Sequence, residues 1–400
     1  MDPYRNPFAP GAGTQPPELA GRTEIIDRAK LTLERVKRGR PEKSFLVVGL
    51  RGVGKTVVLS RIREIAEEIG FKTINIEAVE DKKLVALLVP KLRQLLLSLD
   101  RMAAIDEKVK RALRVLAAFA RSIKATVGEV EFGMSIDSEV GTADSGDLEL
   151  DLPDLFEAVG LAAKSRETCV VLIIDELQYA SEQEMSALIM AIHRVSQRNL
   201  PFVLIGGGLP QLVGLAGKSK SYAERLFDYP RLEQLQTQDA KRALREPIEK
   251  EGSHIENAAL DAIAAKTMGY PYFLQEWGYQ AWNHAQGDTI LATEIPAVTA
   301  TAIKRLDESF FRVRFDRLTP SEQKYMFAMA KRGPGPHRSG DIAAELSRDV
   351  QSVAPIRSSL IKKGMIYSPT HGDTAFTVPM FDEYLQRVVA GSSSSQPRLL

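Results

Sequence analysis

Residues 49–56 combine the amino-acid types and the spacing that suit the binding of phosphate groups. Gly49, Gly52 and Gly54 permit a tight loop with positive φ angles, so successive backbone N–H groups can point at one polyphosphate. Lys55 adds a mobile ammonium group for the β- and γ-phosphates. An ordinary glycine turn is the alternative. The apolar run before this loop and the helical pattern after it favour a nucleotide site, because they provide a strand–loop–helix context.

The next residues complete this phosphate-binding loop, or P-loop. The Thr56 hydroxyl is suited to Mg²⁺, and the positive end of the helix that follows favours the same anion. We therefore expect ATP or ADP to be bound with Mg²⁺. The residues expected to contact the nucleotide here are Gly49, Gly52, Val53, Gly54, Lys55, Thr56 and Val57.

The acidic pair Asp175-Glu176, at the end of the apolar run 169–174, is the second candidate for chemistry. An Asp at the carboxyl end of a buried strand adjacent to the P-loop strand can hold Mg²⁺ through water. The adjacent Glu can orient and deprotonate an attacking water. The pair could instead simply end a core strand. We favour ATP hydrolysis, with Lys55 and Glu176 as catalytic residues and Thr56 and Asp175 at the metal, because the P-loop lies upstream.

Strand-like and helical patterns alternate around these residues. This rhythm predicts an α/β core with a doubly wound parallel sheet. The long helical stretch 82–124 is unusually apolar and contains Pro90; a buried helix is the favoured interpretation and a partner-binding helix the alternative. The predicted strands are 45–48, 72–80, 169–175 and 201–208, and the other predicted helices are 18–39, 57–69 and 182–199.

The length of 400 residues predicts two or three domains. Residues 1–18 are rich in Pro and Gly and predict an extended arm rather than a core element. The further predicted parts are the α/β core at 19–234, a helical lid at 235–308, a C-terminal unit at 309–390 and a disordered tail at 391–400.

Composition is that of an ordinary globular protein, with 44% hydrophobic and 26% charged residues. With 53 Lys and Arg against 52 Asp and Glu, no global basic field draws the chain to nucleic acid or membrane. The single cysteine, Cys169, cannot form an internal disulfide, which suits a reducing compartment. No run of 18 apolar residues and no hydrophobic signal core is present, so we expect a cytoplasmic protein without membrane contact.

Residues 125–163 contain ten Asp and Glu and no Lys or Arg. Apolar residues recur with a period of two, which predicts an acidic β-hairpin insertion at 125–153. The segment is either a contact surface for a basic protein partner or a solvated acidic insertion; the second is favoured because charge runs usually face solvent. The alternating residues are Val130, Phe132, Met134 and Ile136 in the first strand, and Leu148, Leu150 and Leu152 in the second.

Taken together, Gly21-Arg22, the P-loop, Asp175-Glu176 and the helical segment after 235 resemble AAA+ ATPases. Within these the chain is most similar to initiator-type ATPases of the origin-recognition group and the neighbouring STAND signalling ATPases. The resemblance covers about residues 15–390. It implies that Leu19, Gly21 and Arg22 lie beside the adenine and ribose.

Three further positions follow from the resemblance. The family usually has a polar residue that senses the γ-phosphate at the end of the strand after Asp-Glu, but residues 205–208 offer no polar side chain. Either a backbone contact substitutes or sensing is weak. Arg225 is the candidate to reach a neighbouring subunit's nucleotide in a nucleotide-dependent homo-oligomer, or it is a surface arginine. Pro271 either senses nucleotide state near the base or simply starts a helix.

Residues 312–390 read as three helices and a hairpin and resemble a winged helix. They carry 12 Lys and Arg against 8 Asp and Glu, a net charge of +4. The third helix could enter a DNA major groove, and such units also dock proteins. The residues that would face double-stranded DNA are Arg357, Ser358, Lys362 and Lys363.

Two functions are therefore predicted from different classes. The first is a DNA-associated ATPase that acts as a nucleotide-controlled switch. The second is a STAND-like signalling or scaffolding ATPase whose C-terminal unit and acidic insertion bind proteins. A metabolic P-loop kinase is disfavoured because no acceptor-substrate pocket is recognisable and the C-terminal unit would have no use.

Overall fold

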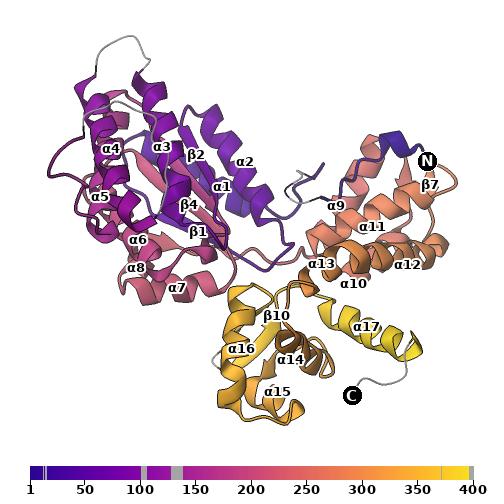
Figure 1. The fold of residues 1–400 in the computed structure, drawn as a ribbon. Helices are drawn as coiled ribbons and strands as arrows, with labels where there is room; N and C mark the ends of the chain where they lie inside the picture. Colours follow the sequence, from indigo (N-terminus) through magenta and orange to yellow (C-terminus); the bar gives the residue numbers. More distant parts are fainter. Residues whose placement is uncertain (12, 14–15, 101–105, 128–137, 371, 396–400) are drawn as a thin grey trace. The chain divides into compact units, whose positions relative to one another are not determined.

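The computed structural model describes residues 1–11, 13, 16–100, 106–127, 138–370 and 372–395 (Figure 1). The chain divides into two compact units. The α/β unit comprises Arg22–Gly49 and Lys55–Leu232. The helical unit comprises Met1–Gly21, Leu50–Gly54 and Glu233–Leu400.

The α/β unit is built on a five-stranded parallel sheet with the strand order β2-β3-β4-β1-β5. Strands β1, β3 and β4 are buried along their whole length, as expected for parallel strands covered on both faces. The predicted parallel sheet is confirmed. The expectation that the Asp175 strand is adjacent to the P-loop strand is wrong, because β4 lies between β1 and β3. The strands are β1 Ser44–Val48, β2 Lys72–Glu77, β3 Val170–Asp175, β4 Phe202–Gly208 and β5 Phe227–Asp228.

Helices surround this sheet, and the stretch predicted as one long helical region contains two of them, α3 and α4. Helix α3 contains Pro90, and its apolar side chains at 88, 92, 96 and 99 are buried, which favours the buried helix over a partner-binding one. Among the described residues, no helix has the length and apolarity needed to cross a membrane. The helices are α1 Thr23–Lys37, α2 Lys55–Glu68, α3 Leu84–Asp100, α4 Glu107–Val127, α5 Leu148–Ser165, α6 Glu182–Gln197, α7 Gln211–Ser219 and α8 Ala223–Leu226.

The prediction of an acidic β-hairpin is wrong for its second strand, because residues 148–153 belong to helix α5. The Asp147 side chain caps this helix by accepting a hydrogen bond from the Glu149 N–H at 2.9 Å. Leu148, Leu152 and Phe156 repeat at intervals of four and are buried, whereas Leu150 is 56% exposed. A helical period therefore fits these leucines better than a period of two. The predicted first strand, at 130–136, lies outside the described residues.

The helical unit starts with four longer helices and two short paired strands, and a π-helix, Leu306–Phe311, and a short helix lead to the C-terminal part. There three helices accompany an antiparallel sheet of order β8-β10-β9, and a further helix follows. The elements are α9 Thr237–Lys250, β6 His254–Ile255, α10 Asn257–Thr267, α11 Pro271–His284, β7 Thr289–Ile290, α12 Ile295–Arg305, α13 Arg312–Phe315, α14 Pro320–Ala330, β8 His337–Arg338, α15 Ser339–Glu345, α16 Val350–Lys362, β9 Ile366–Tyr367, β10 Asp373–Phe376 and α17 Phe381–Ser395.

Two details of the C-terminal prediction can be compared with these elements. The predicted hairpin is confirmed, because β9 and β10 pair antiparallel. The predicted disordered tail is wrong for residues 391–395, which continue helix α17; residues 396–400 lie outside the described residues.

The N-terminal arm starts with a short 3-10 helix, Pro3–Arg5, and contributes to the core of the helical unit, contrary to expectation. Phe8 is only 2% exposed. A Cβ at Gly278 of α11 would lie 2.8 Å from the Phe8 ring, so glycine leaves the space that the ring fills. The Trp282 indole N–H donates to the Asp2 carbonyl at 2.8 Å and ties the arm to the same helix.

Phe8→Ala should lower the free energy of unfolding of the helical unit by about 3–5 kcal/mol, because it leaves a cavity of aromatic size. Tyr4→Ala is the matched control, since Tyr4 is 99% exposed on the same arm, and it should change stability by less than about 0.5 kcal/mol. Urea denaturation followed by circular dichroism measures both. Equal effects of the two substitutions would show that the Phe8 contact does not stabilise the unit.

Candidate nucleotide site

The P-loop joins the end of β1 to the start of α2, where it was predicted. The Gly49 N–H donates to the Gly208 carbonyl at 3.1 Å, which fixes the first loop residue to β4. Gly52 and Gly54 have φ angles of 80° and 93°, a region that favours glycine. The buried Lys55 ammonium group donates to the Gly49 carbonyl at 3.0 Å and so lies across the loop. The glycines thus have the positive φ angles that were expected of them, and the Lys55 side chain folds back to the first residue of the loop.

Thr56 and Asp175 meet although 119 positions separate them: the Thr56 hydroxyl donates to the Asp175 carboxylate at 2.5 Å. They meet because the carboxyl ends of parallel strands share one edge of the sheet. Burial is the main cause that raises the pKa of Asp175; the Thr56 hydrogen bond opposes it, and the Glu176 charge adds to it. Hydroxyl and carboxylate oxygens are ligands that Mg²⁺ accepts, so this pair fits a magnesium ion shared with phosphates.

Glu176 follows β3 in a strained backbone conformation. Its φ angle is 52°, a value that residues other than glycine rarely adopt. Its N–H donates to the Asp175 carboxylate at 2.8 Å, which helps to hold that conformation. The Glu176 side chain is half-buried, and its carboxylate accepts a hydrogen bond from the Gln178 amide. The acidic pair is thus held at the same edge of the sheet as the P-loop.

Neighbouring side chains pack closely against the three glycines at the end of β4. A Cβ at Gly206 would lie 2.7 Å from a Leu46 methyl carbon, and a Cβ at Gly207 would lie 2.8 Å from one of Leu59. A Cβ at Gly208 would lie 2.8 Å from the Gln178 amide oxygen. Any side chain at these three positions would therefore have to displace the ends of neighbouring side chains. Sequence reasoning missed Gln178, whose only signal was a polar residue two positions after Glu176.

Most of the other residues predicted to contact the nucleotide lie in turns and loops, and Val57 lies in the first turn of α2. Gly21 has a φ of 67°, and a Cβ there would lie 2.8 Å from the Asp239 carboxylate, while Leu19 is half-buried. Arg22 is 8% exposed and precedes α1. Within the P-loop region Val53 is buried and Val57 is half-buried.

Pro271 is the first residue of α11, as expected for a proline that starts a helix. The next residue, Tyr272, donates its N–H to the Gly52 carbonyl at 3.2 Å within the helical unit. Both interpretations of Pro271 remain compatible with this placement.

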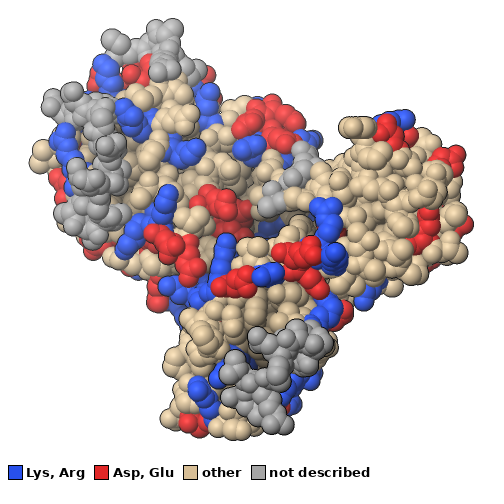
Figure 2. Space-filling model, turned by 45° about the vertical axis from the view of Figure 1, so that its right-hand side comes forward, with Lys and Arg blue, Asp and Glu red and all other residues tan. Residues whose placement is uncertain are grey.

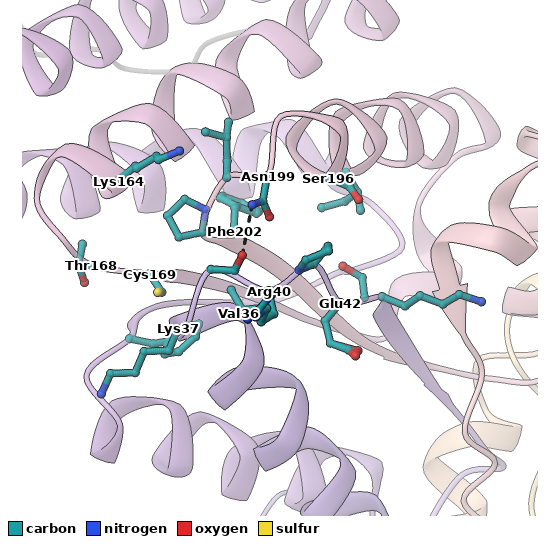
Figure 3. A pocket seen from close by; sticks show the side chains of 18 of the residues that line it. Val36, Lys37, Arg40, Glu42, Lys164, Thr168, Cys169, Ser196, Asn199 and Phe202 are labelled. Atoms are coloured by element: carbon teal, nitrogen blue, oxygen red, sulfur yellow. Dashed lines mark hydrogen bonds between the residues drawn. The ribbon is translucent and has the colours of Figure 1, made fainter.

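Arg225 lies at the other end of the sheet from the P-loop of its own chain. It lines a pocket of about 870 Å³ together with Ser44 and Phe202, which begin β1 and β4. Lys37, Arg40, Lys164 and Cys169 also line this pocket (Figure 3). Cys169 is free, and burial raises the pKa of its thiol while the Lys37 charge opposes the rise. Arg225 is therefore not brought together with Lys55 and Glu176 of the same chain.

The four residues expected to face DNA, three in α16 and Lys363 directly after it, differ in their surroundings. The Arg357 guanidinium donates to the Thr374 hydroxyl and the Asp373 carbonyl, both at 2.9 Å. Lys363 forms a 2.8 Å ion pair with Glu322. Ser358 and Lys362 are exposed. Two of the four side chains are thus engaged within the C-terminal part itself.

Several acidic side chains of the segment 125–163 form ion pairs within the protein. Basic residues from neighbouring helices neutralise acidic side chains on both sides of Asp147, including Glu139 before it and Glu157 after it. The pairs are Arg111–Glu139 at 2.8 Å, Lys220–Glu149 at 2.9 Å, Arg194–Asp154 at 3.1 Å and Arg198–Glu157 at 2.8 Å. In its described part, the segment is therefore not an unpaired acidic surface, and a basic partner for it stays a prediction.

Comparisons with known families match two separate parts of the chain. Residues 18–205 match the AAA ATPase domain. Residues 308–385 match a domain of unknown function. No curated protein matches the chain.

Among solved structures, the Walker-type ATPase PABY2304 of Pyrococcus abyssi is similar, with a TM-score of 0.55 and 14% identity over 93% of this chain and 97% of that one. The RuvB Holliday junction branch migration motor of Thermotoga maritima has a TM-score of 0.45 and 16% identity over 93% and 98%. Cdc6p from Pyrobaculum aerophilum has a TM-score of 0.46 and 11% identity over 98% of this chain and 99% of that one. At such identities the likeness concerns the fold alone.

The parallel sheet, the P-loop, the match to the AAA ATPase domain and the similarity to the fold of PABY2304 support an AAA+ ATPase core in this chain. They suggest ATPase activity and nucleotide binding, which in such proteins typically involves Mg²⁺.

The acidic residue at the start of α14 gives a test by pH. Burial alone would raise the pKa of Glu322, but hydrogen bonds from Lys363, Ser359 and Thr319 lower it to about 2 from 4.5. Because the folded pKa is the lower one, its stabilising effect is complete above about pH 4.5 and is lost as the pH falls towards 2. Glu322→Gln should therefore be less stable at neutral pH and lose less stability over that range.

The measurement is the thermal midpoint of both proteins between pH 7 and 2, with exposed Glu308→Gln as the control, which should follow the wild type. Parallel curves for the wild type and Glu322→Gln would show that the bonded carboxylate does not stabilise the fold.

Proposed function

We propose that this chain binds Mg²⁺-ATP at residues 49–56 and hydrolyses it to ADP and phosphate, with Glu176 as the general base. The observation that carries the proposal is the hydrogen bond between Thr56 and Asp175. It brings two oxygen ligands suited to Mg²⁺ together at the start of α2, directly after the loop that would hold the phosphates.

Each residue has a separate role in this proposal. The P-loop N–H groups and the Lys55 ammonium bind and orient the phosphates. Thr56 and Asp175 hold Mg²⁺, which when bound offsets negative charge on the phosphate oxygens. Glu176 orients the attacking water and takes its proton. The raised pKa of buried Asp175 agrees with a site that benefits from a cation.

By resemblance, we assign the adenine and ribose to Leu19, Gly21 and Arg22, and nucleotide sensing to Pro271. Arg225 would act on the nucleotide of a second copy in a homo-oligomer. Its distance from the P-loop of its own chain, at the opposite ends of β1, supports a role between copies rather than within one. ATP and ADP would then favour different states of the chain, which makes it a nucleotide-controlled switch.

For the C-terminal part we propose a winged helix that contacts double-stranded DNA. The order α14-β8-α15-α16-β9-β10 and its three-stranded antiparallel sheet support this. Ser358 and Lys362 are the exposed candidates for phosphate contacts. On the face drawn in Figure 2, however, basic and acidic side chains are interspersed rather than gathered into one basic surface. The second candidate, a signalling or scaffolding ATPase, is favoured by the internal bonds of Arg357 and Lys363.

The assigned base gives the principal prediction. Glu176→Gln should keep ATP binding and lose turnover, because the amide cannot take a proton from water. Lys55→Ala should lose ATP binding, because the phosphates lose their ammonium partner. Calorimetry measures binding, and phosphate release measures turnover. Normal turnover by Glu176→Gln would rule out this residue as the base.

DNA contact is tested by binding to double-stranded DNA at several salt concentrations, with and without ATP. Lys362→Ala should weaken binding and reduce the salt dependence by about one phosphate contact. Lys324→Ala removes an exposed lysine of α14 and serves as the matched control. Absence of binding at low salt in every nucleotide state would leave the protein-docking function as the remaining candidate.

A further inference from the structure

The Gln178 side chain lies between the candidate base and the end of β4. It belongs to the short 3-10 helix Leu177–Tyr179, which directly follows Glu176. Its amide nitrogen donates to the Glu176 carboxylate, and its amide oxygen accepts the Leu209 N–H at 3.0 Å. Both ends of one side chain are therefore used in a bridge between the two strand ends.

The bridge fixes the orientation of the amide. In the reverse orientation, the amide oxygen would face a carboxylate oxygen and the amide NH₂ group would face the Leu209 N–H. Both contacts would be repulsive, because a carboxylate only accepts and a backbone N–H only donates. The NH₂ group of Gln178 is thus held towards Glu176.

Gly208 provides the space for this bridge. A Cβ there would lie 2.8 Å from the Gln178 amide oxygen, which is closer than non-bonded atoms approach. The Gly208 carbonyl also accepts the Gly49 N–H at 3.1 Å. The strand end that anchors the Gln178 amide therefore also anchors the first residue of the P-loop.

We propose that Gln178 is the positioning residue of Glu176 and that it supplies the polar side chain that the glycine end of β4 lacks. Held through Leu209, its amide restricts the Glu176 carboxylate to one orientation next to Asp175. This inference rests on the proposed function, in which Glu176 orients the attacking water. A general base must be held close to its productive geometry, since a displacement of about 1 Å can lower a rate about 100-fold.

Gln178→Met tests the bridge, because methionine has a similar length and cannot make either hydrogen bond. In the full chain, the KM for ATP should stay within about threefold of the wild-type value, while the rate of hydrolysis per ATP-binding site falls about 10- to 100-fold. Counting sites by bound ATP removes any effect of partly unfolded protein. Gln183→Met is the matched control, since Gln183 is exposed on α6, and it should leave both values unchanged.

Gly208→Ala perturbs the same bridge from the other side, because the new methyl group must displace the Gln178 amide. It should also lower the rate per site. Combined with Gln178→Ala, it should cost less than the sum of the two single losses, since the displaced amide is then absent and only the close contact with Leu212 remains.

Wild-type rates per site in Gln178→Met, or additive losses in the Gln178→Ala and Gly208→Ala pair, would overturn the inference. These outcomes leave the proposed function intact if Glu176→Gln is inactive. A wild-type chain that binds ATP without hydrolysing it would instead remove the proposed function, and the positioning role with it.

Discussion

The pairing of β4 with both β1 and β3 is the constraint on which the candidate site depends. Its register places Val48 opposite Gly208 and Ile174 opposite Gly206, so three chain segments end at one edge of the sheet. Gly49 and Thr56, which flank the loop, the acidic pair and the glycine strand end are consequently neighbours. The hydrogen bond between Thr56 and Asp175 spans the width of β4, and side chains of β1, α2 and Gln178 pack closely against the glycine end of β4. A substituent on that strand end would therefore disturb several parts of the site at once.

Sequence reasoning found the P-loop and the acidic pair because both are short motifs in which each residue type has its own chemical reason. It placed the Asp175 strand beside the P-loop strand, whereas β4 separates them, because the order of strands in a sheet is a long-range property that spacing does not report. It also missed Gln178. An isolated glutamine carries no pattern, and only the fold shows that its amide connects Glu176 to β4.

Two other differences have local causes. Leucines at 148, 150 and 152 fit a strand period, but two of them also fit a helical period that continues to Phe156, and the cap at Asp147 decides in favour of the helix. Phe8 was assigned to an arm because Pro and Gly surround it. Its burial depends on a glycine 270 positions away in α11, which no local pattern indicates. Sequence reasoning also overestimated the number of charged side chains that are available to a partner. Glu139, Arg357 and Lys363 all form ion pairs or hydrogen bonds with residues far away in the chain, which no local pattern indicates.

The central claim is that the edge of the sheet formed by β1, β3 and β4 holds Mg²⁺-ATP. Calorimetric titration of the wild-type chain with ATP, in the presence of Mg²⁺ and then with Mg²⁺ chelated, tests it most directly. The account predicts one binding site per chain and weaker binding without the metal, because Thr56 and Asp175 would then lack the cation that they are placed to hold. Absence of ATP binding, or an affinity that does not depend on Mg²⁺, would contradict it.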